Sequence, residues 1–215
     1  MSEIDRRWPE SQKRTSFTMS DRATQPTISL SIKNGGKSIP YGRGERPDGS
    51  KNHGFKPLKA NPEEIAAIPE AQDIAALKNA LVELNSPSSP FFTVGCEKAF
   101  NRNNSGHWVN GYLEFAFNYR ELIEDGQYYF KLFFYFNQWH WKLERKPSVQ
   151  YNFELEGAHF LKASTGGLTM SVWIATGTFP TKESAQSAWE QGLDTVVAFL
   201  KQQGVPPDSR YTRIY

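Results

Sequence analysis

Residues 91–179 constrain the fold more than any other part of the chain, because their apolar side chains recur at every second position. Such alternation is typical of β-strands that bury one face. Segments rich in Asn, Ser, Asp and Gly, which favour turns, interrupt it at 101–106, 124–126 and 164–167. The pattern predicts about five strands, at 91–100, 108–120, 127–142, 149–162 and 168–179. Connections this short join antiparallel neighbours, so we expect an antiparallel sheet with meander topology.

Helical patterns flank the predicted strands on both sides. The segment 61–64 (Asn-Pro-Glu-Glu) is a favourable helix start, and an apolar stripe at three- and four-residue spacing follows over 74–84. Near the C-terminus, Thr181 can cap a second helix, which has a wide apolar face as far as Leu200 and ends at Gly204. We therefore expect an α+β fold in which an N-terminal and a C-terminal helix pack on one face of the sheet.

The first 60 residues differ in composition from the rest of the chain. They hold 12 Lys and Arg against 6 Asp and Glu, whereas residues 61–215 hold 13 against 17. Their Ser-, Gly- and Pro-rich sequence offers too little apolar surface to build a core. One exception is the alternating segment 27–32, which predicts a short strand able to add to a sheet edge. We expect a long, polar, basic and largely irregular arm over 1–60 and a single α+β domain over 61–215.

Strand parity sorts the side chains of the predicted sheet onto two faces. The core face would include Phe92, Val94 and Cys96 from the first strand and Phe130, Leu132, Phe134 and Phe136 from the third. The other face would be acidic and aromatic. Its candidate binding residues are Trp108, Tyr112, Phe133, Tyr135, Trp139, Trp173, Glu114, Glu154 and Glu156. Large aromatic patches usually mark contact surfaces, although the arm or a second subunit could also cover such a face.

The sequence contains no clear catalytic or metal-binding motif. The segment 31–38 ends in Gly-Lys-Ser, but Ser31 stands where a phosphate-binding loop requires Gly, and Pro40 opposes the helix that should follow. Parity places Cys96 in the core, where a buried thiol is more common than a nucleophile. The four histidines (53, 107, 140 and 159) share no metal-ligand spacing. We therefore predict no catalytic residue, no metal site and no cofactor.

Three functions are open at this point. The first is a non-enzymatic module that presents the aromatic-acidic face to a protein partner or to a second copy, assisted by the arm. The second is binding of single-stranded nucleic acid, in which aromatic residues stack on bases and basic residues follow the backbone. The basic residues would come from the arm: Lys33, Lys37, Arg43, Arg46 and Lys51. Glutamates on the same face would repel phosphates, so this function ranks second. A weaker alternative is an enzyme with its site on the open sheet face or at a strand end, where paired carboxylates such as Glu154 and Glu156 can do acid-base work.

Cysteine usage and hydropathy predict the compartment. A single cysteine excludes an intrachain disulfide and does not require an oxidising environment. No apolar run approaches the roughly 20 residues of a membrane-spanning helix. The first 25 residues alternate acids and bases and lack the apolar centre of a signal peptide. A cytoplasmic location without membrane contact is therefore expected.

Overall fold

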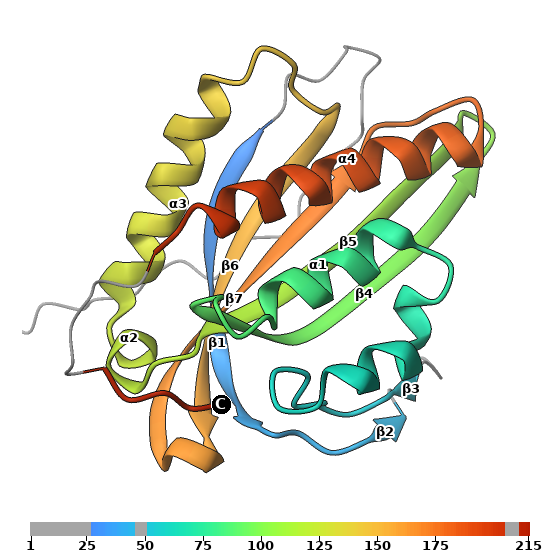
Figure 1. Ribbon diagram of the computed structural model, residues 1–215. Helices are drawn as coiled ribbons and strands as arrows, with labels where there is room; N and C mark the ends of the chain where they lie inside the picture. Colours follow the sequence, from blue (N-terminus) through green and yellow to red (C-terminus); the bar gives the residue numbers. More distant parts are fainter. Residues whose placement is uncertain (1–26, 46–50, 205–210) are drawn as a thin grey trace, which may run out of the picture.

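The computed structural model describes residues 27–45, 51–204 and 211–215 (Figure 1). Five strands form the central sheet in the order β1-β6-β7-β5-β4. These strands are β1 (Ile28–Ile39), β4 (Phe91–Asn103), β5 (Gly106–Phe117), β6 (Val149–Phe160) and β7 (Thr165–Thr176). β1 runs parallel to β6, whereas the other neighbouring strands are antiparallel. Four of the five predicted strands are present, and β1 is the fifth strand of the sheet. The sheet is mixed and does not follow a meander.

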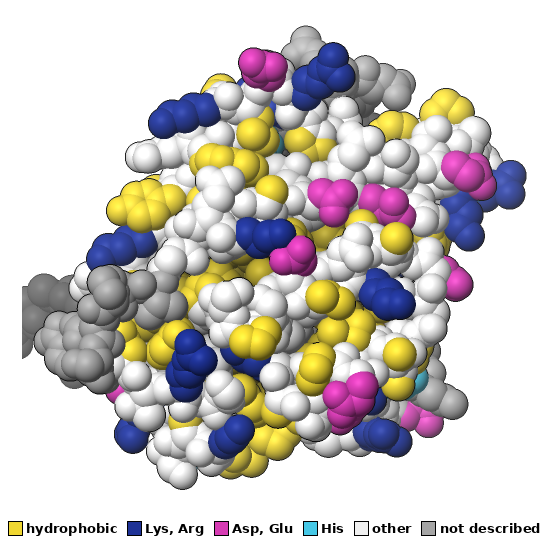
Figure 2. All heavy atoms as spheres, viewed as in Figure 1, with side chains coloured by type: hydrophobic (Ala, Val, Ile, Leu, Met, Phe, Trp, Pro, Cys, Tyr) yellow, Lys and Arg dark blue, Asp and Glu magenta, His cyan; other side chains and the backbone are white. Residues whose placement is uncertain are grey.

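Helices cover one face of the sheet. They are α1 (Ala75–Leu84), α2 (Arg120–Glu124), α3 (Gly126–Trp141) and α4 (Lys182–Lys201). Figure 1 shows α1, α3 and α4 lying across the same side of the strands. Figure 2 shows this side as a surface, where side chains of both charges lie scattered among exposed hydrophobic ones. The remaining elements are short: β2 (Gly44–Glu45), β3 (Lys51–Asn52) and the 3₁₀ turns η1 (Pro62–Ala67), η2 (Pro69–Ala71) and η3 (Leu161–Ala163).

The prediction of a strand at 127–142 is wrong, because this segment forms the helix α3. Asp125 caps the helix by accepting a hydrogen bond of 2.9 Å from the backbone N–H of Gln127. Tyr129, Leu132 and Phe136 follow at helical spacing and are buried. The other two residues assigned to the core from this segment, Phe130 and Phe134, are 37% and 58% exposed. Strand parity put them on the core face, whereas a helix turns them toward solvent.

The helix α3 explains why the sheet is not a meander. β5 and β6 are both antiparallel to β7, which lies between them, so they are parallel to each other. A connection between parallel strands needs a dozen or more residues, and α2 and α3 supply it.

Strand β1 completes the sheet from the N-terminal side. The strand predicted at 27–32 is its first half, and Ile28, Leu30 and Ile32 lie in register with the buried Tyr151, Phe153 and Leu155. A register shift between Lys33 and Gly36 contains Gly35, whose φ of 137° favours glycine. Residues 28–39 of the predicted arm therefore belong to the sheet. Residues 1–26 and 46–50 of that arm lie outside the described residues.

The main core lies between the sheet and the helices. Trp189 of α4 is fully buried, and its indole N–H donates to the carbonyl of Ile174 at 3.1 Å. Gly111 of β5 makes room for this ring, because a Cβ there would lie 2.9 Å from its Cζ2 atom. Burial of a large apolar side chain contributes about 1.5–3 kcal/mol, so this layer determines the fold.

A smaller aromatic cluster covers one end of the opposite face. Phe92 packs against Phe160 and Tyr215, with ring centroids 6.2 and 4.9 Å apart, and Phe55 also contacts Tyr215. Phe92 was predicted on the core face. A register shift between Thr93 and Gly95 changes the parity of β4, so Phe92 faces away from the helices.

Candidate binding site on the open sheet face

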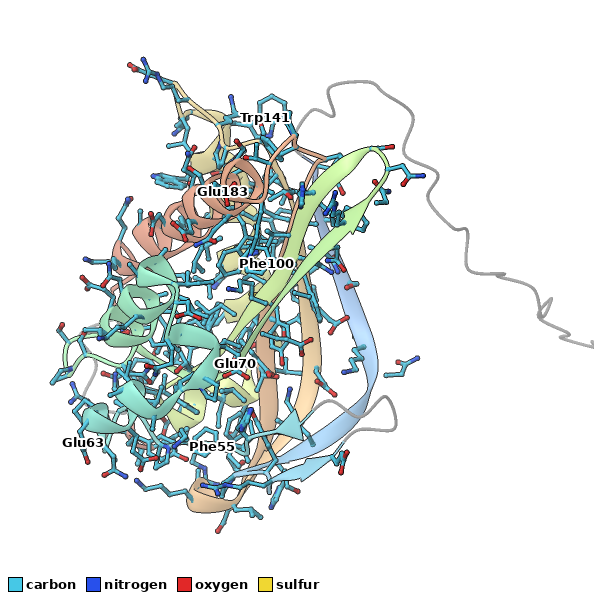
Figure 3. The ribbon with its side chains drawn as sticks, turned by 90° about the vertical axis from the view of Figure 1, so that its right-hand side faces the viewer. Phe55, Glu63, Glu70, Phe100, Trp141 and Glu183 are labelled. Atoms are coloured by element: carbon cyan, nitrogen blue, oxygen red, sulfur yellow. The ribbon has the colours of Figure 1, made fainter. Side chains whose placement is uncertain are left out.

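The sheet face turned away from α1, α3 and α4 is called the open face below. In Figure 3, α1 and α4 lie to one side of the sheet, and the open face is turned away from them. The aromatic cluster around Phe92 covers one end of this face. Among the described residues, no helix covers the remainder. Its polar side chains come from β1, β4, β5, β6 and β7, which the register places in rows across the sheet.

A partly buried ion cluster forms on the open face around Glu114, Glu156 and Lys37. The ammonium group of Lys37 contacts Oε1 of Glu114 and lies 2.9 Å from Oε2 of Glu156. Lys33 adds a longer ion pair of 3.4 Å to the other oxygen of Glu156. The Glu114 side chain is only 6% exposed, so its charge depends on Lys37 for compensation.

The electrostatics of this cluster favour the charged forms of Lys37 and Glu156. Burial alone would lower the pKa of Lys37, but the adjacent carboxylates of Glu114 and Glu156 outweigh it and raise this pKa above its usual value. Burial would raise the pKa of Glu156, but hydrogen bonds and attraction from Lys37 and Lys33 lower it overall. Neither group therefore titrates near neutral pH, where a general acid or base is most effective.

An aromatic pair lies one to two rows along the sheet from the ion cluster. Tyr112 of β5 and Trp173 of β7 are directly opposite in register, and their ring centroids are 4.6 Å apart. Glu97 pairs with Tyr112 on one side, and Asn152 pairs with Trp173 on the other. Glu154 lies in the neighbouring row opposite Ser171. The open face thus combines aromatic rings with carboxylates, as the sequence predicted.

Six of the nine predicted binding residues lie on this face. They are Trp108, Tyr112, Trp173, Glu114, Glu154 and Glu156. The predicted position on this face is wrong for Phe133, Tyr135 and Trp139, which lie on α3 at the other side of the sheet. Phe133 packs on Phe153, Trp139 packs on Phe199, and Tyr135 is 52% exposed. The reason is again that a helix, not a strand, carries them.

The predicted basic arm residues do not form one cluster. Lys33 and Lys37 are on β1 and engage carboxylates of the sheet. Arg43 is exposed just before β2, and Lys51 belongs to β3. Arg46 lies outside the described residues.

A cavity of about 530 Å³ opens between the ion cluster, β4 and the segment after β1. Glu70 of η2, labelled in Figure 3, lines it together with Lys56 and Tyr41. Sequence reasoning missed these three residues, because they come from segments without strand periodicity. Cys96 also lines the cavity, and burial raises the pKa of its thiol to about 12. Cys96 is therefore protonated at neutral pH and is not an activated nucleophile.

Three side-chain oxygen atoms approach Gly95 closely on the wall of this cavity. A Cβ built on Gly95 would lie 3.0 Å from Oη of Tyr41, 3.6 Å from Oε2 of Glu114 and 3.7 Å from Oη of Tyr112. The Tyr41 hydroxyl donates to the carbonyl of Val94 at 2.9 Å. A side chain at position 95 would therefore crowd the Tyr41 hydroxyl. A glycine inside a strand pattern suggests a bulge or the close approach of another group, and Gly95 was the one sequence signal for this crowded position.

The described part of the chain shows neither a cluster of metal ligands nor a membrane-spanning helix. Residues 27–45, 51–204 and 211–215 contain no group of three or more His, Cys, Asp or Glu arranged to hold a metal ion. No helix within those ranges is long and apolar enough to span a membrane.

The chain matches no known family model, and no curated protein or solved structure shows significant similarity to it. Its function must therefore be inferred from the arrangement of its own residues.

Proposed function

We propose that this chain is a non-enzymatic interaction module that presents its open face to a basic segment of a protein partner. The observation that carries the proposal is the Tyr112–Trp173 pair, which lies on a sheet face that the described helices leave uncovered. Aromatic side chains are enriched at the centres of protein interfaces and dominate their binding energy.

The neighbouring charges favour a basic partner. Glu97 and Glu154 flank the aromatic pair within the same two rows of the sheet. A Lys or Arg side chain placed over an aromatic ring is attracted to its face, and adjacent carboxylates strengthen that attraction. The same carboxylates disfavour nucleic acid, because they would repel phosphates beside the rings that would stack the bases.

The alternatives have weaker support. A nucleic-acid site would need accessible cations, but Lys33 and Lys37 are paired with Glu156 and Glu114. An acid-base enzyme would need a group that titrates near neutral pH, and the shifts of Lys37 and Glu156 move both groups away from it.

The test compares two tryptophans on opposite sides of the molecule. Trp173→Ala removes half of the aromatic pair, whereas Trp141→Ala removes a 71% exposed indole from α3. The wild-type protein and both variants are used as baits in a lysate of the source organism, and captured proteins are quantified by mass spectrometry. A captured candidate is then purified and titrated against each variant.

We expect Trp173→Ala to weaken binding of the purified partner by about 2 kcal/mol or more, as loss of a buried aromatic anchor does. Trp141→Ala should bind like the wild type. Equal affinities of the two variants would refute the proposal. Loss of a self-associated state in Trp173→Ala alone, seen by light scattering, would identify a second copy as the partner.

A further inference from the structure

We propose that β1 is a dimerisation strand, which pairs antiparallel with β1 of a second copy of this chain. β1 forms one edge of the five-stranded sheet, and β6 is its one neighbour among the described strands. Pairing across this edge would join two sheets into one continuous sheet. The inference goes beyond the proposed function, because it uses the edge of the sheet and not its open face.

The backbone groups of three β1 residues point away from the sheet. The carbonyl of Thr27 accepts from the N–H of Tyr151 at 2.9 Å, so Thr27 faces β6. Successive residues of a strand direct their N–H and C=O groups to opposite sides, so Ile28, Leu30 and Ile32 direct theirs outward. No hydrogen bond from the described residues reaches these outward groups. Such an edge is a template for another strand.

The sequence of this edge reads the same in both directions. Residues 28–32 are Ile-Ser-Leu-Ser-Ile, a palindrome centred on Leu30. A two-fold axis at Leu30 would place this residue opposite its own copy, and Ile28 opposite Ile32 of the second copy. The opposed residues are those whose backbone groups point outward, so each pair exchanges both of its hydrogen bonds. A two-fold interface requires such self-complementarity, which favours a second copy over an unrelated strand.

The side chains of this edge also suit a second copy. Ile32 is 67% exposed, and in the dimer it would lie beside Ile28 of the other copy. Aliphatic pairs directly opposite each other stabilise antiparallel strands. Lys33 is the one charged residue of 27–33, and it would lie opposite Thr27 and not opposite a like charge. The dimer therefore covers an exposed aliphatic side chain without opposing two cations.

Helix α3 adds apolar surface on the same side of the sheet. Phe153, the register partner of Leu30, packs on Phe133 with ring centroids 5.5 Å apart. Phe133 in turn contacts Phe134 at 5.4 Å, and Phe134 is 58% exposed. Aromatic side chains are enriched in protein interfaces, so Phe134 can enlarge the contact beyond the strand itself.

The other edge of the sheet is protected, whereas β1 is not. Charged side chains and covering elements are common devices against the pairing of strand edges. β4 carries Glu97, Lys98 and Arg102. The turn η2 packs against this strand, and the Tyr41 hydroxyl donates to the carbonyl of Val94. Residues 28–32 of β1 contain no charged residue, and the register shift of this strand begins only after Lys33.

Sedimentation velocity of the full chain over a wide range of concentrations tests the dimer. We expect the wild type to dimerise and to dissociate on dilution. Ile32→Lys should weaken dimerisation about tenfold or more, because it places an ammonium group opposite Ile28 within the paired edge. Val82→Lys is the matched control, because it introduces the same side chain at a 50% exposed position on α1. A monomeric wild type, or equal dimerisation of the two variants, would overturn the inference.

Cysteine cross-linking tests the register. Leu30→Cys should form a disulfide-linked dimer in air, because opposed residues of a hydrogen-bonded pair have Cα atoms about 5.5 Å apart. Ile32→Cys alone should not cross-link, whereas a mixture of the Ile28→Cys and Ile32→Cys proteins should. The wild type, whose one cysteine is Cys96, is the control. Cross-linking of Ile32→Cys alone, with none in the mixture beyond it, would overturn the inference even if Leu30→Cys does not fold.

The dimer and the proposed function fail in different ways. Trp173 lies on β7, two strands from the β1 edge, so Trp173→Ala should dimerise like the wild type. If Trp173→Ala dissociates the dimer and Ile32→Lys does not, the open face is the surface of self-association and the inference falls. If Ile32→Lys dissociates the dimer while Trp173→Ala retains the purified partner, the dimer stands and the proposed function falls.

Discussion

At the scale of single residues, the Lys37 ammonium is the most consequential group of the open face. It joins β1 to the carboxylates of β5 and β6 through one buried cluster. Removing one partner of a buried ion pair leaves an uncompensated charge, which costs about 3–5 kcal/mol. We therefore expect Lys37→Met to lower the free energy of unfolding by about this amount, measured by urea denaturation at neutral pH.

Lys33→Met is the matched control for this prediction. Its side chain is 52% exposed and also contacts Glu156, and exposed ion pairs contribute only about 0–1 kcal/mol. Equal losses of unfolding free energy in the two variants would mean that the lower exposure of Lys37 does not increase the contribution of its ion pairs to stability.

The ion cluster also predicts a dependence on pH. The pKa of Glu156 is lower in the folded protein than its ordinary value of 4.5. Its contribution to stability is therefore present above about pH 4.5 and is lost as the pH falls through the folded pKa. The stability difference between the wild type and Lys37→Met should shrink over this acidic range.

At the scale of elements, the helix α3 is a case in which the hydrophobic pattern does not distinguish a helix from a strand. Nine of its sixteen residues are Tyr, Phe or Trp, which favour strands by propensity. Apolar residues this dense satisfy a period of two and a helical period equally well. The strands β5, β6 and β7 were predictable, because polar and apolar residues alternate along much of their length. The capping Asp125 and the 16-residue length were the available signals for a helix.

The helical assignment makes a direct mutational prediction. Phe136 is fully buried between α4 and β6, with ring centroids 5.3 Å from Phe199 and 5.0 Å from Phe153. Phe136→Ala should therefore destabilise the protein by about 3–5 kcal/mol in thermal or chemical unfolding. Phe134→Ala, two residues earlier and 58% exposed, should cost less than about 1 kcal/mol. Strand geometry would give these two residues equal losses, so equal losses would argue against the helix.

The candidate site was predictable in part, and for a similar reason. Parity along β5, β6 and β7 correctly grouped Tyr112, Glu114 and Trp173 on one face. Two features were not predictable: the ion pairs of Lys37, which was expected only as a basic arm residue, and the place of Tyr41 in the cavity. They depend on the register of a parallel strand and on a loop, and neither leaves a periodic pattern in the sequence.

At the scale of the whole molecule, the last residues of the chain complete the fold. Ile214 is buried, and the ring of Tyr215 packs on Phe92. The Asn118 side chain accepts from the N–H of Tyr215 and donates to its carbonyl, each at 2.8 Å. Deletion of residues 211–215 should lower the free energy of unfolding by about 3 kcal/mol or more, because it removes the buried contacts of Ile214 and of the Tyr215 ring.

The control for this truncation is Thr212→Ala, which alters only an exposed side chain. It should leave the urea midpoint close to that of the wild type. A truncated protein with an unchanged midpoint would show that the aromatic cluster at this end of the sheet is stable without the C-terminus.

The pairing of β1 with β6 has a consequence for the synthesis of the protein. Ser29 of β1 donates to the carbonyl of Tyr151, which is 122 residues further along the chain. Strand β1 therefore leaves the ribosome on the order of ten seconds before β6, at ordinary elongation rates. During this time Ile28 and Leu30 have no partner strand, and a nascent chain with an open strand edge is prone to associate with others. The alternation of these residues with Ser29 and Ser31 halves the apolar surface that β1 exposes while the ribosome completes the sheet.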